Sequence, residues 1–309
     1  MMGCPLLRRW LAWWLLAAGS AAAPRQACGC AVRAANASRL LENPACPDRF
    51  RGHAAIDPRG AELTVAYLYY RDAAYAEQHV AAWNAFDAAL LRRIVFVVVD
   101  DGSPAGDSAE AAISRLAPLG RVVVVRIFED AAWNVGGARN LAFHVAPTEV
   151  VLVVDADQML SAALLSWVLD HAPAEGCDVL RGFPRVLSDG RAFRRVHPGV
   201  ICASRSTYWT TGGCDEDFVG AYGYTDAHLN RRVETAAGCA LVAADAAPPL
   251  VQIGDVEKTH YFSRDTSRNK ALLDAKTAEG GVWSGDYLRF SWATAYDSAR
   301  RRPPEPRVV

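Results

Sequence analysis

The sequence predicts an α/β fold in which a doubly wound, mostly parallel sheet carries helices on both faces, with a smaller region attached. Three observations support this prediction. Apolar residues make up 51% of the 309 positions, which is enough for a large core and excludes wholesale disorder. Several runs are continuously apolar and β-branched, as strands buried on both faces are. Helical segments separate these runs, and such alternation implies parallel strands.

The first expected elements are a strand at residues 63–69 and a helix at residues 73–91 whose apolar residues share one face. The second strand, at 94–99, is a continuous β-branched run (IVFVVV), and a helix at 108–116 follows it. The later elements keep this order: strands at 121–127, 149–154 and 179–183, and helices at 136–145, 161–171 and 225–237. Ligands of such sheets bind beyond the carboxyl ends of the strands, so the residues after each strand are the candidates for function.

The two ends of the chain differ from this middle part. Residues 1–23 combine two arginines, a short apolar run and small residues, which is typical of a signal peptide. The run is shorter than the about 20 residues of a membrane span, and a signal anchor is the alternative. We expect a stem or N-terminal extension at 24–60, the main domain at 61–290, and a charged, proline-rich, disordered tail at 291–309.

The leader and the cysteines indicate a secretory compartment. One of the eight cysteines, Cys4, lies in the leader, and the other seven leave at least one thiol without a partner in this chain. We expect disulfides formed in an oxidising lumen, with a connectivity that the sequence leaves open. The protein is therefore expected in the lumen of the Golgi or endoplasmic reticulum, or secreted, and in contact with a membrane only through a possible N-terminal anchor.

The charge balance excludes one class of partner. The chain has 33 Lys and Arg residues against 34 Asp and Glu residues, a formal net charge of −1. Proteins that bind nucleic acid usually carry a strong basic excess. No nucleic-acid partner is expected.

Acidic residues follow the second and the fourth strand. Asp100-Asp101-Gly102-Ser103 comes after one, and Asp155-Ala156-Asp157 after the other. Residues two apart in an extended chain project to the same side, so both carboxylates of Asp155 and Asp157 can address one cation. A divalent cation bound there can neutralise phosphate charge. An isolated Asp-x-Asp is common by chance, and its position after a buried strand is what favours a metal site over a helix cap.

Four motifs in this order resemble the GT-A glycosyltransferases of the family-two type. They are Asp-Asp-Gly-Ser (100–103), Asn-x-Gly-Gly-Ala-Arg-Asn (134–140), Val-Val-Asp-Ala-Asp (153–157) and the segment 212–226, which reads GGCDEDFVGAYGYTD. The resemblance covers about residues 62–262. It implies the GT-A fold, with a smaller acceptor-side region, and transfer of a sugar from a nucleotide diphosphate, usually UDP, with Mn²⁺ or Mg²⁺.

The resemblance also implies roles for single residues. The nucleotide of the donor is expected to contact Tyr70, Arg71, Asp100, Asp101, Arg139 and Asp155. Asp157 is the expected direct metal ligand, together with Asp155. Asp226 matches the carboxylate that acts as base, while Thr225 replaces the Glu of the family's Glu-Asp pair. The expected acceptor-side residues are Trp209, Gly213, Asp215 and Glu216.

A second resemblance concerns residues 256–265, which are similar to a His-Ser-Arg-Asp stretch of β-1,4-galactosyltransferase-like enzymes, with Tyr261 and Phe262 inserted. It makes His260 a candidate third metal ligand, although a histidine that ends a strand and contacts backbone is an equal alternative. Arg264 or Arg268 is expected to neutralise the leaving diphosphate.

These expectations combine into one function and two alternatives. The sequence predicts a metal-dependent, inverting hexosyl- or N-acetylhexosaminyltransferase, with Asp226 as base and a glycan, glycoprotein or glycolipid as acceptor. A sugar-nucleotide pyrophosphorylase would need a glycine-rich basic loop after the first strand, where the chain has Tyr69-Tyr70-Arg71-Asp72. A catalytically silent module that binds sugar or Ca²⁺ is the second alternative, and it would not need Asp226.

Overall fold

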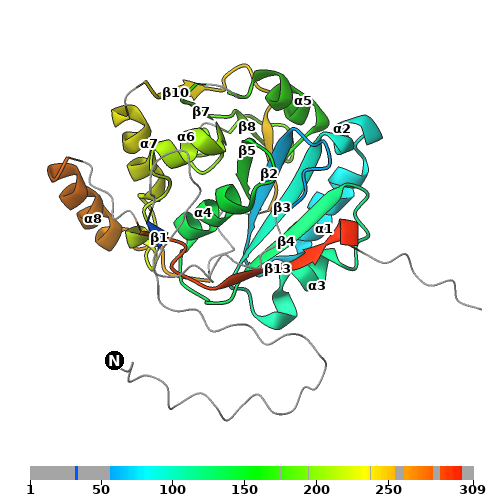
Figure 1. Ribbon diagram of the computed structural model, residues 1–309, viewed down its shortest axis with the longest axis horizontal. Helices are drawn as coiled ribbons and strands as arrows, with labels where there is room; N and C mark the ends of the chain where they lie inside the picture. The colour runs from blue at the N-terminus through cyan, green and yellow to red at the C-terminus, as the bar shows by residue number, and fades with distance from the viewer. Residues whose placement is uncertain are drawn as a thin grey trace, which may run out of the picture.

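The structure is a computed structural model that describes residues 32–33, 56–173, 176–193, 195–236, 238–254, 261–280 and 286–300. Within these residues, an eight-stranded sheet lies between two layers of helices (Figure 1). Its strands are β2 Leu63–Tyr69, β3 Ile94–Asp101, β4 Arg121–Ile127, β5 Val150–Asp155, β7 Asp178–Arg181, β9 Ile201–Ser204, β10 Ala240–Ala243 and β13 Trp292–Asp297.

The sheet is mixed and mostly parallel, as predicted. Its strand order is β10-β7-β9-β5-β2-β3-β4-β13. The neighbours β5, β2, β3 and β4 are parallel, while β9 and β13 run antiparallel to the strands beside them. The parallel strands β5, β2 and β3 end at one edge of the sheet, which brings Asp155, Tyr69 and Asp100 into neighbouring positions.

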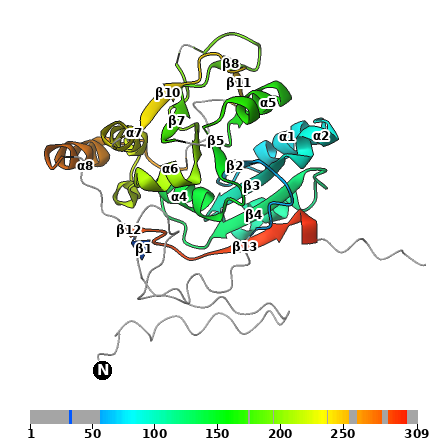
Figure 2. The same cartoon turned by 45° about the horizontal axis from the view of Figure 1, so that its top comes forward.

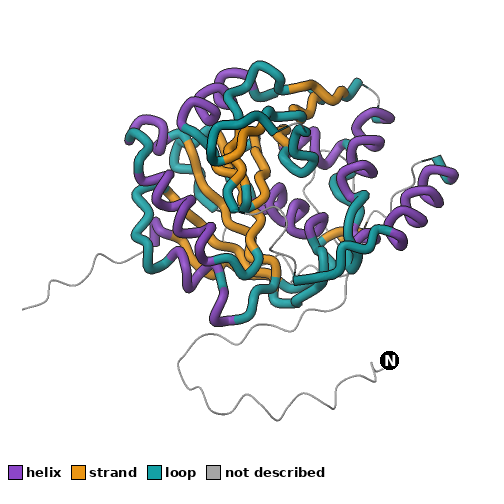
Figure 3. The backbone as a smooth tube through the Cα atoms, turned by 180° about the vertical axis from the view of Figure 1, so that it is seen from behind, coloured by secondary structure: helices purple, strands orange, loops and turns teal. Residues whose placement is uncertain are grey.

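Alternate residues of the central strands enter two separate cores. The helices are α1 Ala73–Asn84, α2 Ala88–Arg92, α3 Ala109–Ile113, α4 Val135–Val145, α5 Ala162–His171, α6 Arg205–Thr210, α7 Thr225–Thr235 and α8 Ser267–Ala278. One core joins Phe96 and Val98 of β3 to α1, α3 and α5, and the other joins Val97 and Val99 to α4, α6 and α7. In Figure 1, α4 crosses in front of the strands, and Figure 3 shows the opposite layer from behind. Burial on both faces explains the unbroken β-branched run.

Two small sheets complete the fold. Three short strands, β6 Gln158–Met159, β8 Arg185–Leu187 and β11 Leu250–Gln252, pair in the order β6-β11-β8 beside the end of β5. The pair β1 Val32–Arg33 and β12 Asp286–Tyr287 is antiparallel and joins two segments that are far apart in the sequence. In Figure 2 this pair lies below α7, and α8 projects from the body at the side far from α1 and α2.

Two expected boundaries need correction. The helix predicted at 73–91 is interrupted after Asn84, because the Asp87 side chain accepts a hydrogen bond from the Leu90 N–H and starts α2. The main domain does not end at residue 290, and the tail expected at 291–309 begins with β13, which pairs antiparallel with β4 along the sheet edge. The proline-rich composition starts only after residue 302, and it dominated our interpretation of the whole segment.

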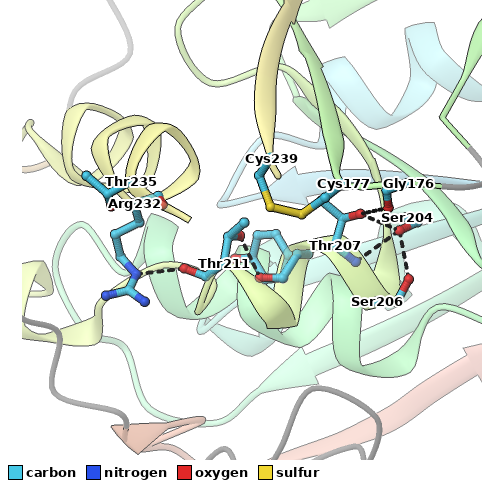
Figure 4. The surroundings of a disulfide bond; sticks show 10 residues. Gly176, Cys177, Ser204, Ser206, Thr207, Thr211, Arg232, Thr235 and Cys239 are labelled. Carbon is cyan, nitrogen blue, oxygen red and sulfur yellow. Dashed lines mark hydrogen bonds between the residues drawn. A yellow bond between two sulfur atoms is a disulfide. The ribbon is translucent and has the colours of Figure 1, made fainter. Parts of the chain in front are cut away.

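A disulfide joins Cys177 to Cys239, with 4.4 Å between the Cα atoms and a sequence separation of 62 (Figure 4). The two cysteines immediately precede β7 and β10, which pair in parallel. The bond therefore fastens the segment that follows α7 to the sheet. Cys202 and Cys214 are buried free thiols. The disulfide is the kind of cross-link expected in an oxidising compartment.

The predicted leader lies outside the described residues, as does the stem apart from Val32–Arg33 and residues 56–60. Among the residues that the structure describes, no helix combines the length and apolar composition that crossing a bilayer requires.

Candidate active site

Three carboxylates that are far apart in sequence lie at one site. Asp155 ends β5, Asp157 follows it before β6, and Asp226 lies in the first turn of α7. Their side chains are exposed to a similar degree, 30%, 32% and 29%, so each is partly open to solvent. The fold therefore brings the two acids of the Asp-x-Asp motif close to Asp226.

Arg139 connects two of these carboxylates. It lies on α4 with 1% of its side chain exposed, and its Nη1 donates to Asp226 Oδ1 at 2.5 Å. Its Nη2 is 3.8 Å from Asp155 Oδ1. Burial on its own would lower the pKa of Arg139, but the carboxylates of Asp226 and Asp155 raise it above the ordinary value. Arg139, predicted to lie near the nucleotide, thus forms a buried bridge within the site.

The backbone before Asp226 is constrained. Tyr224, which precedes α7, has a φ of 65°, in the left-handed region. A non-glycine residue in that region costs about 1–2 kcal/mol and is a feature often found at functional sites. The side chain of Asn269 on α8 donates to the carbonyls of Phe218, Ala221 and Gly223, which holds the loop ahead of α7.

His197 belongs to the site although the sequence analysis did not select it. Its Nε2 is 3.6 Å from Asp155 Oδ2 and 3.9 Å from Asp157 Oδ1. Its Nδ1 accepts the N–H of Gly199 at 3.1 Å, so in neutral imidazole the proton lies on Nε2 and faces the carboxylates. Burial raises the pKa of Asp155, and His197 and Arg139 oppose that rise.

Gly199 is a second residue that the sequence did not reveal. A Cβ at this position would lie 2.5 Å from Asp155 Oδ2 and 2.6 Å from Arg139 Nη2. The close approach requires a residue without a side chain. A single His-Pro-Gly sequence carries no periodicity or spacing that could have indicated this role.

Helix α1 holds the backbone of the Asp-x-Asp motif. The Nε2 of His79 is 2.7 Å from the carbonyl oxygen of Ala156, and because a carbonyl only accepts, His79 donates. His79 is 3% exposed, and this burial lowers its pKa to about 4. His79 is therefore neutral at pH 7 and acts as a fixed donor beneath the motif.

The two acids after β3 have different surroundings. Asp101 accepts a hydrogen bond from the Asn134 amide at 2.8 Å, ahead of the same α4 that carries Arg139. Burial, together with nearby carboxylates, raises its pKa to about 7. Asp100 is fully buried, and its two oxygens accept the N–H groups of Ser103 and Ala109. We correct its expected nucleotide role to a structural one, because backbone donors occupy both oxygens.

Tyr70 and Arg71 lie at the end of β2. The Tyr70 hydroxyl donates to Asp130 Oδ1 at 3.0 Å, and its ring lies 5.4 Å from that of Tyr261. The Arg71 guanidinium lies 4.7 Å from the Tyr261 ring and 3.4 Å from Asp107 Oδ2. Both residues contact groups that follow other strands, which is consistent with the expected rim, and their contact with a nucleotide stays a prediction.

The expected acceptor residues Asp215 and Glu216 serve the fold. Asp215 is 1% exposed, and its Oδ2 is 2.7 Å from the Lys276 Nζ of α8. The oxygens of Glu216 accept hydrogen bonds from the Asn140 amide and from the N–H groups of Leu288 and Arg289. We therefore correct their role: these acids join α4, α8 and the segment before β13, and they were selected because the family pattern does not reveal burial.

The glycine and the tryptophan of the acceptor set are also inside. Gly213 has a φ of 60°, and a Cβ there would lie 3.0 Å from Asn140 Oδ1, so glycine is needed for the close turn. Trp209 is 9% exposed and packs edge-on against Tyr208 and Tyr287 in the core. Its expected position on the acceptor side is therefore corrected to core packing.

Of the C-terminal candidates, His260 lies outside the described residues. Arg268 donates to the backbone carbonyls of Val219 and Asp217 and so holds the loop before α7. Arg264 lies over the ring of Tyr222 at 5.3 Å.

An open pocket of about 470 Å³ lies between η3 (Glu216–Phe218) and α8. None of the three carboxylates Asp155, Asp157 and Asp226 lines it.

The site suits a divalent cation only in part. Asp155 and Asp157 supply hard oxygen donors, which Mg²⁺ and Mn²⁺ accept. Within the described ranges, no group of three or more His, Cys, Asp or Glu side chains is arranged to hold a metal ion. Two carboxylates completed by substrate phosphates form the usual Mg²⁺ arrangement, so the donor set fits an ion that arrives with a diphosphate.

Part of the sequence matches a known family, and the fold is similar to solved structures. Residues 80–228 match the model described as glycosyl transferase family 2. No curated protein matches the sequence. S. aureus TarS, solved with UDP-GlcNAc, aligns at 14% identity over 72% of this chain and 67% of its own, with a TM-score of 0.55.

Two further solved structures are similar. GalNAc-T7, with UDP, GalNAc and Mn²⁺, aligns at 13% identity over 71% of this chain and 48% of its own, with a TM-score of 0.50. The mannosyltransferase PcManGT from Pyrobaculum calidifontis, with GDP-Man and Mn²⁺, aligns at 20% identity over 76% and 69%, with a TM-score of 0.48. The similarity of residues 256–265 to galactosyltransferases stays a prediction. The sheet order agrees with the GT-A fold of these structures, and residues 80–228 of the chain match the glycosyl transferase family 2 model.

Proposed function

We propose that the protein is a glycosyltransferase, which moves a hexosyl or N-acetylhexosaminyl group from a nucleoside diphosphate, with UDP as the preferred nucleotide, to a hydroxyl of a glycan, glycoprotein or glycolipid. The observation that carries the proposal is the Arg139 bridge, because it holds Asp226 and the Asp-x-Asp motif in one partly exposed site. Sugar transfer needs a base at the acceptor hydroxyl and a diphosphate-binding motif at the leaving group of the same sugar. Arg139 lies beside a candidate for each, Asp226 and Asp155.

Asp226 is the proposed base. One of its oxygens contacts Arg139, which fixes the carboxylate, and 29% of the side chain is open to an incoming hydroxyl. The carboxylate removes the acceptor proton as the hydroxyl attacks the anomeric carbon. Attack from the side opposite the diphosphate gives inversion.

Asp157 and Asp155 would hold Mn²⁺ or Mg²⁺ together with the diphosphate. Once bound, such an ion would supply Lewis-acid stabilisation of the leaving phosphate. The Arg139 guanidinium lies 3.8 Å from Asp155 and offsets its charge, so Asp157 is the proposed direct ligand. Asp101, with its raised pKa, and Tyr70 and Arg71 are the proposed nucleotide contacts. The disulfide supports the proposed location in a secretory lumen.

The test uses a panel of UDP- and GDP-sugars with Mn²⁺. We expect at least one donor to raise the melting temperature and to be hydrolysed slowly without acceptor. Asp226→Asn should lower the transfer rate about 10²- to 10⁴-fold while donor binding persists. Asp245→Asn, at an exposed aspartate, is the matched control. Transfer by Asp226→Asn at the native rate would refute the base assignment, and no response to any donor would favour a silent binding module.

A further inference from the structure

The carboxylate of Asp157 is held by two neutral amides. Gln252 Nε2 donates to Asp157 Oδ2 at 2.9 Å, and Gln158 Nε2 donates to Asp157 Oδ1 at 3.1 Å. Both glutamines are buried, at 3% and 0% exposure. Each oxygen of Asp157 therefore has a donor that comes from the protein interior.

The small sheet brings the two glutamines together. Strand β11 pairs antiparallel with β6, with Gln252 opposite Gln158, and the Ile253 N–H donates to the Asp157 carbonyl at 2.8 Å. On its other side β11 pairs in parallel with β8. A segment 95 residues away in the chain is thereby fixed directly beside the Asp-x-Asp motif.

The orientation of the Gln252 amide follows from its partners. Its Oε1 accepts from Arg185 Nη1 at 3.2 Å and from Gln158 Nε2 at 2.5 Å. A guanidinium can only donate and an ionised carboxylate can only accept, so Oε1 faces Arg185 and Nε2 faces Asp157. Arg185 thus sets the direction of the Gln252 amide, and through that amide it acts on the Asp157 carboxylate.

The two carboxylates of the motif are treated differently. Asp155 lies 3.8 Å from the Arg139 guanidinium, which offsets its charge, whereas the His197 ring lies near both carboxylates. The two amides on Asp157 are neutral, so they restrict its rotation without cancelling its charge. A fixed orientation together with a retained charge suits a carboxylate that binds a cation. Hydrogen-bond partners behind a metal ligand fix the orientation of that ligand and raise its affinity for the metal.

We propose that Gln252 is a positioning residue that orients the Asp157 carboxylate for a divalent cation, with Gln158 as the second donor and Arg185 setting the Gln252 amide. This inference rests on the proposed function, since it requires Asp157 to bind the metal. It assigns a role to β11, a strand that no motif in the sequence indicated.

The test is Mn²⁺ binding followed by the electron paramagnetic resonance signal of the free ion, with UDP present and a blank of UDP without protein. Gln252→Met keeps the volume and removes the donor, and Gln252→Asn keeps an amide but shortens it by one methylene. We expect the apparent Kd for Mn²⁺ to rise about 10- to 100-fold in both. Gln78→Met, at an exposed position of α1, should bind as the wild type does.

A turnover measurement separates positioning from general damage. In both Gln252 variants the rate should recover at saturating Mn²⁺, while the Mn²⁺ concentration for half-maximal rate rises by the same factor as the Kd. If both variants bind Mn²⁺ as tightly as wild type while Asp157→Ala does not bind it, the inference is wrong and the proposed function stands. If the wild-type protein with UDP binds no Mn²⁺, the proposed metal site fails and this inference with it.

Discussion

Arg139 Nη1 donates to Asp226 Oδ1 at 2.5 Å, joining a helix of the central domain to the first turn of α7 across 87 residues of sequence. The arginine is almost completely buried, while the aspartate is open on one side. The proposed base is therefore fixed from within the protein. Its position depends on a residue that the sequence analysis assigned only to the neighbourhood of the nucleotide.

Replacing this arginine should damage both stability and catalysis. Arg139→Met leaves the carboxylates of Asp155 and Asp226 without their shared cation. Breaking a buried pair costs about 3–5 kcal/mol, and we expect the lower end because both carboxylates are partly solvated. Urea unfolding measures the loss, with the exposed Arg115→Met as control. Equal stability of the two variants would show that the bridge contributes nothing to the folded state.

Asp100 should behave as a structural residue. Asp100→Asn replaces one acceptor of the pair that holds the Ser103 and Ala109 N–H groups. An unsatisfied buried N–H costs about 1–3 kcal/mol, so the unfolding free energy should fall by that amount while the donor KM stays near that of wild type. In contrast, Asp101→Asn should change the donor KM more than the stability. A KM effect confined to Asp100→Asn would reverse these two assignments.

A methyl group at position 199 should disturb the site directly. In Gly199→Ala the new Cβ must displace the Asp155 carboxylate or the Arg139 guanidinium. A shift of about 1 Å at catalytic groups can lower the rate about 100-fold, and we expect a loss of that order in kcat/KM. Gly106→Ala is the matched control, since no atom beyond its two chain neighbours lies within 4 Å of the place that its new Cβ would occupy. Similar rates for the two variants would contradict the close packing at Gly199.

The disulfide should stabilise the region behind α7. Linking residues 62 positions apart removes unfolded-state entropy worth about 4 kcal/mol. The double variant Cys177→Ser/Cys239→Ser should therefore melt at a lower temperature than wild type. A reductant should lower the melting temperature of the wild type and leave that of the double variant unchanged. If a reductant lowered the melting temperature of both proteins equally, the reducible bond responsible would not be the Cys177–Cys239 disulfide.

His79 should make stability depend on pH. Its pKa is lowered from 6.5 to about 4 in the folded state, so between these values the unfolded state binds more protons. This contribution is present above pH 6.5 and is lost as the pH falls to 4, by up to about 3 kcal/mol. The raised pKa of Asp101 acts in the opposite direction, so the difference between wild type and His79→Gln isolates the effect. A difference that does not change with pH would contradict a neutral, buried His79.

The sequence was sufficient for the parts of this protein that follow periodic rules. The valine-rich runs identified the parallel strands, and their ends located Asp101, Asp155 and Asp157, because strand polarity brings such ends to one edge. Asp226 came from the resemblance alone. Periodicity does not reveal which distant residue a side chain will contact in the folded protein.

The acids Asp215 and Glu216 illustrate that limit. Their residue types match an acceptor motif, but both side chains are bound in the interior. Asp215 pairs with Lys276, and Glu216 accepts two backbone N–H groups from the C-terminal segment. These partners lie 60 or more residues away, and nothing in the local sequence announces them. His197, Gly199 and Gln252 were missed for the same reason, since each becomes part of the site only through tertiary contact.

The pairing of β1 with β12 bears on how the protein should be shortened for expression. Tyr287 in β12 is followed by Leu288 and Arg289, whose N–H groups bind Glu216. A recombinant form that starts beyond residue 33 would lack β1, the strand that pairs with β12. The hydrogen bonds from Leu288 and Arg289 to Glu216, in the loop that leads to α7, would then be held less firmly. Shortened versions intended for crystallisation should accordingly retain the residues around Val32.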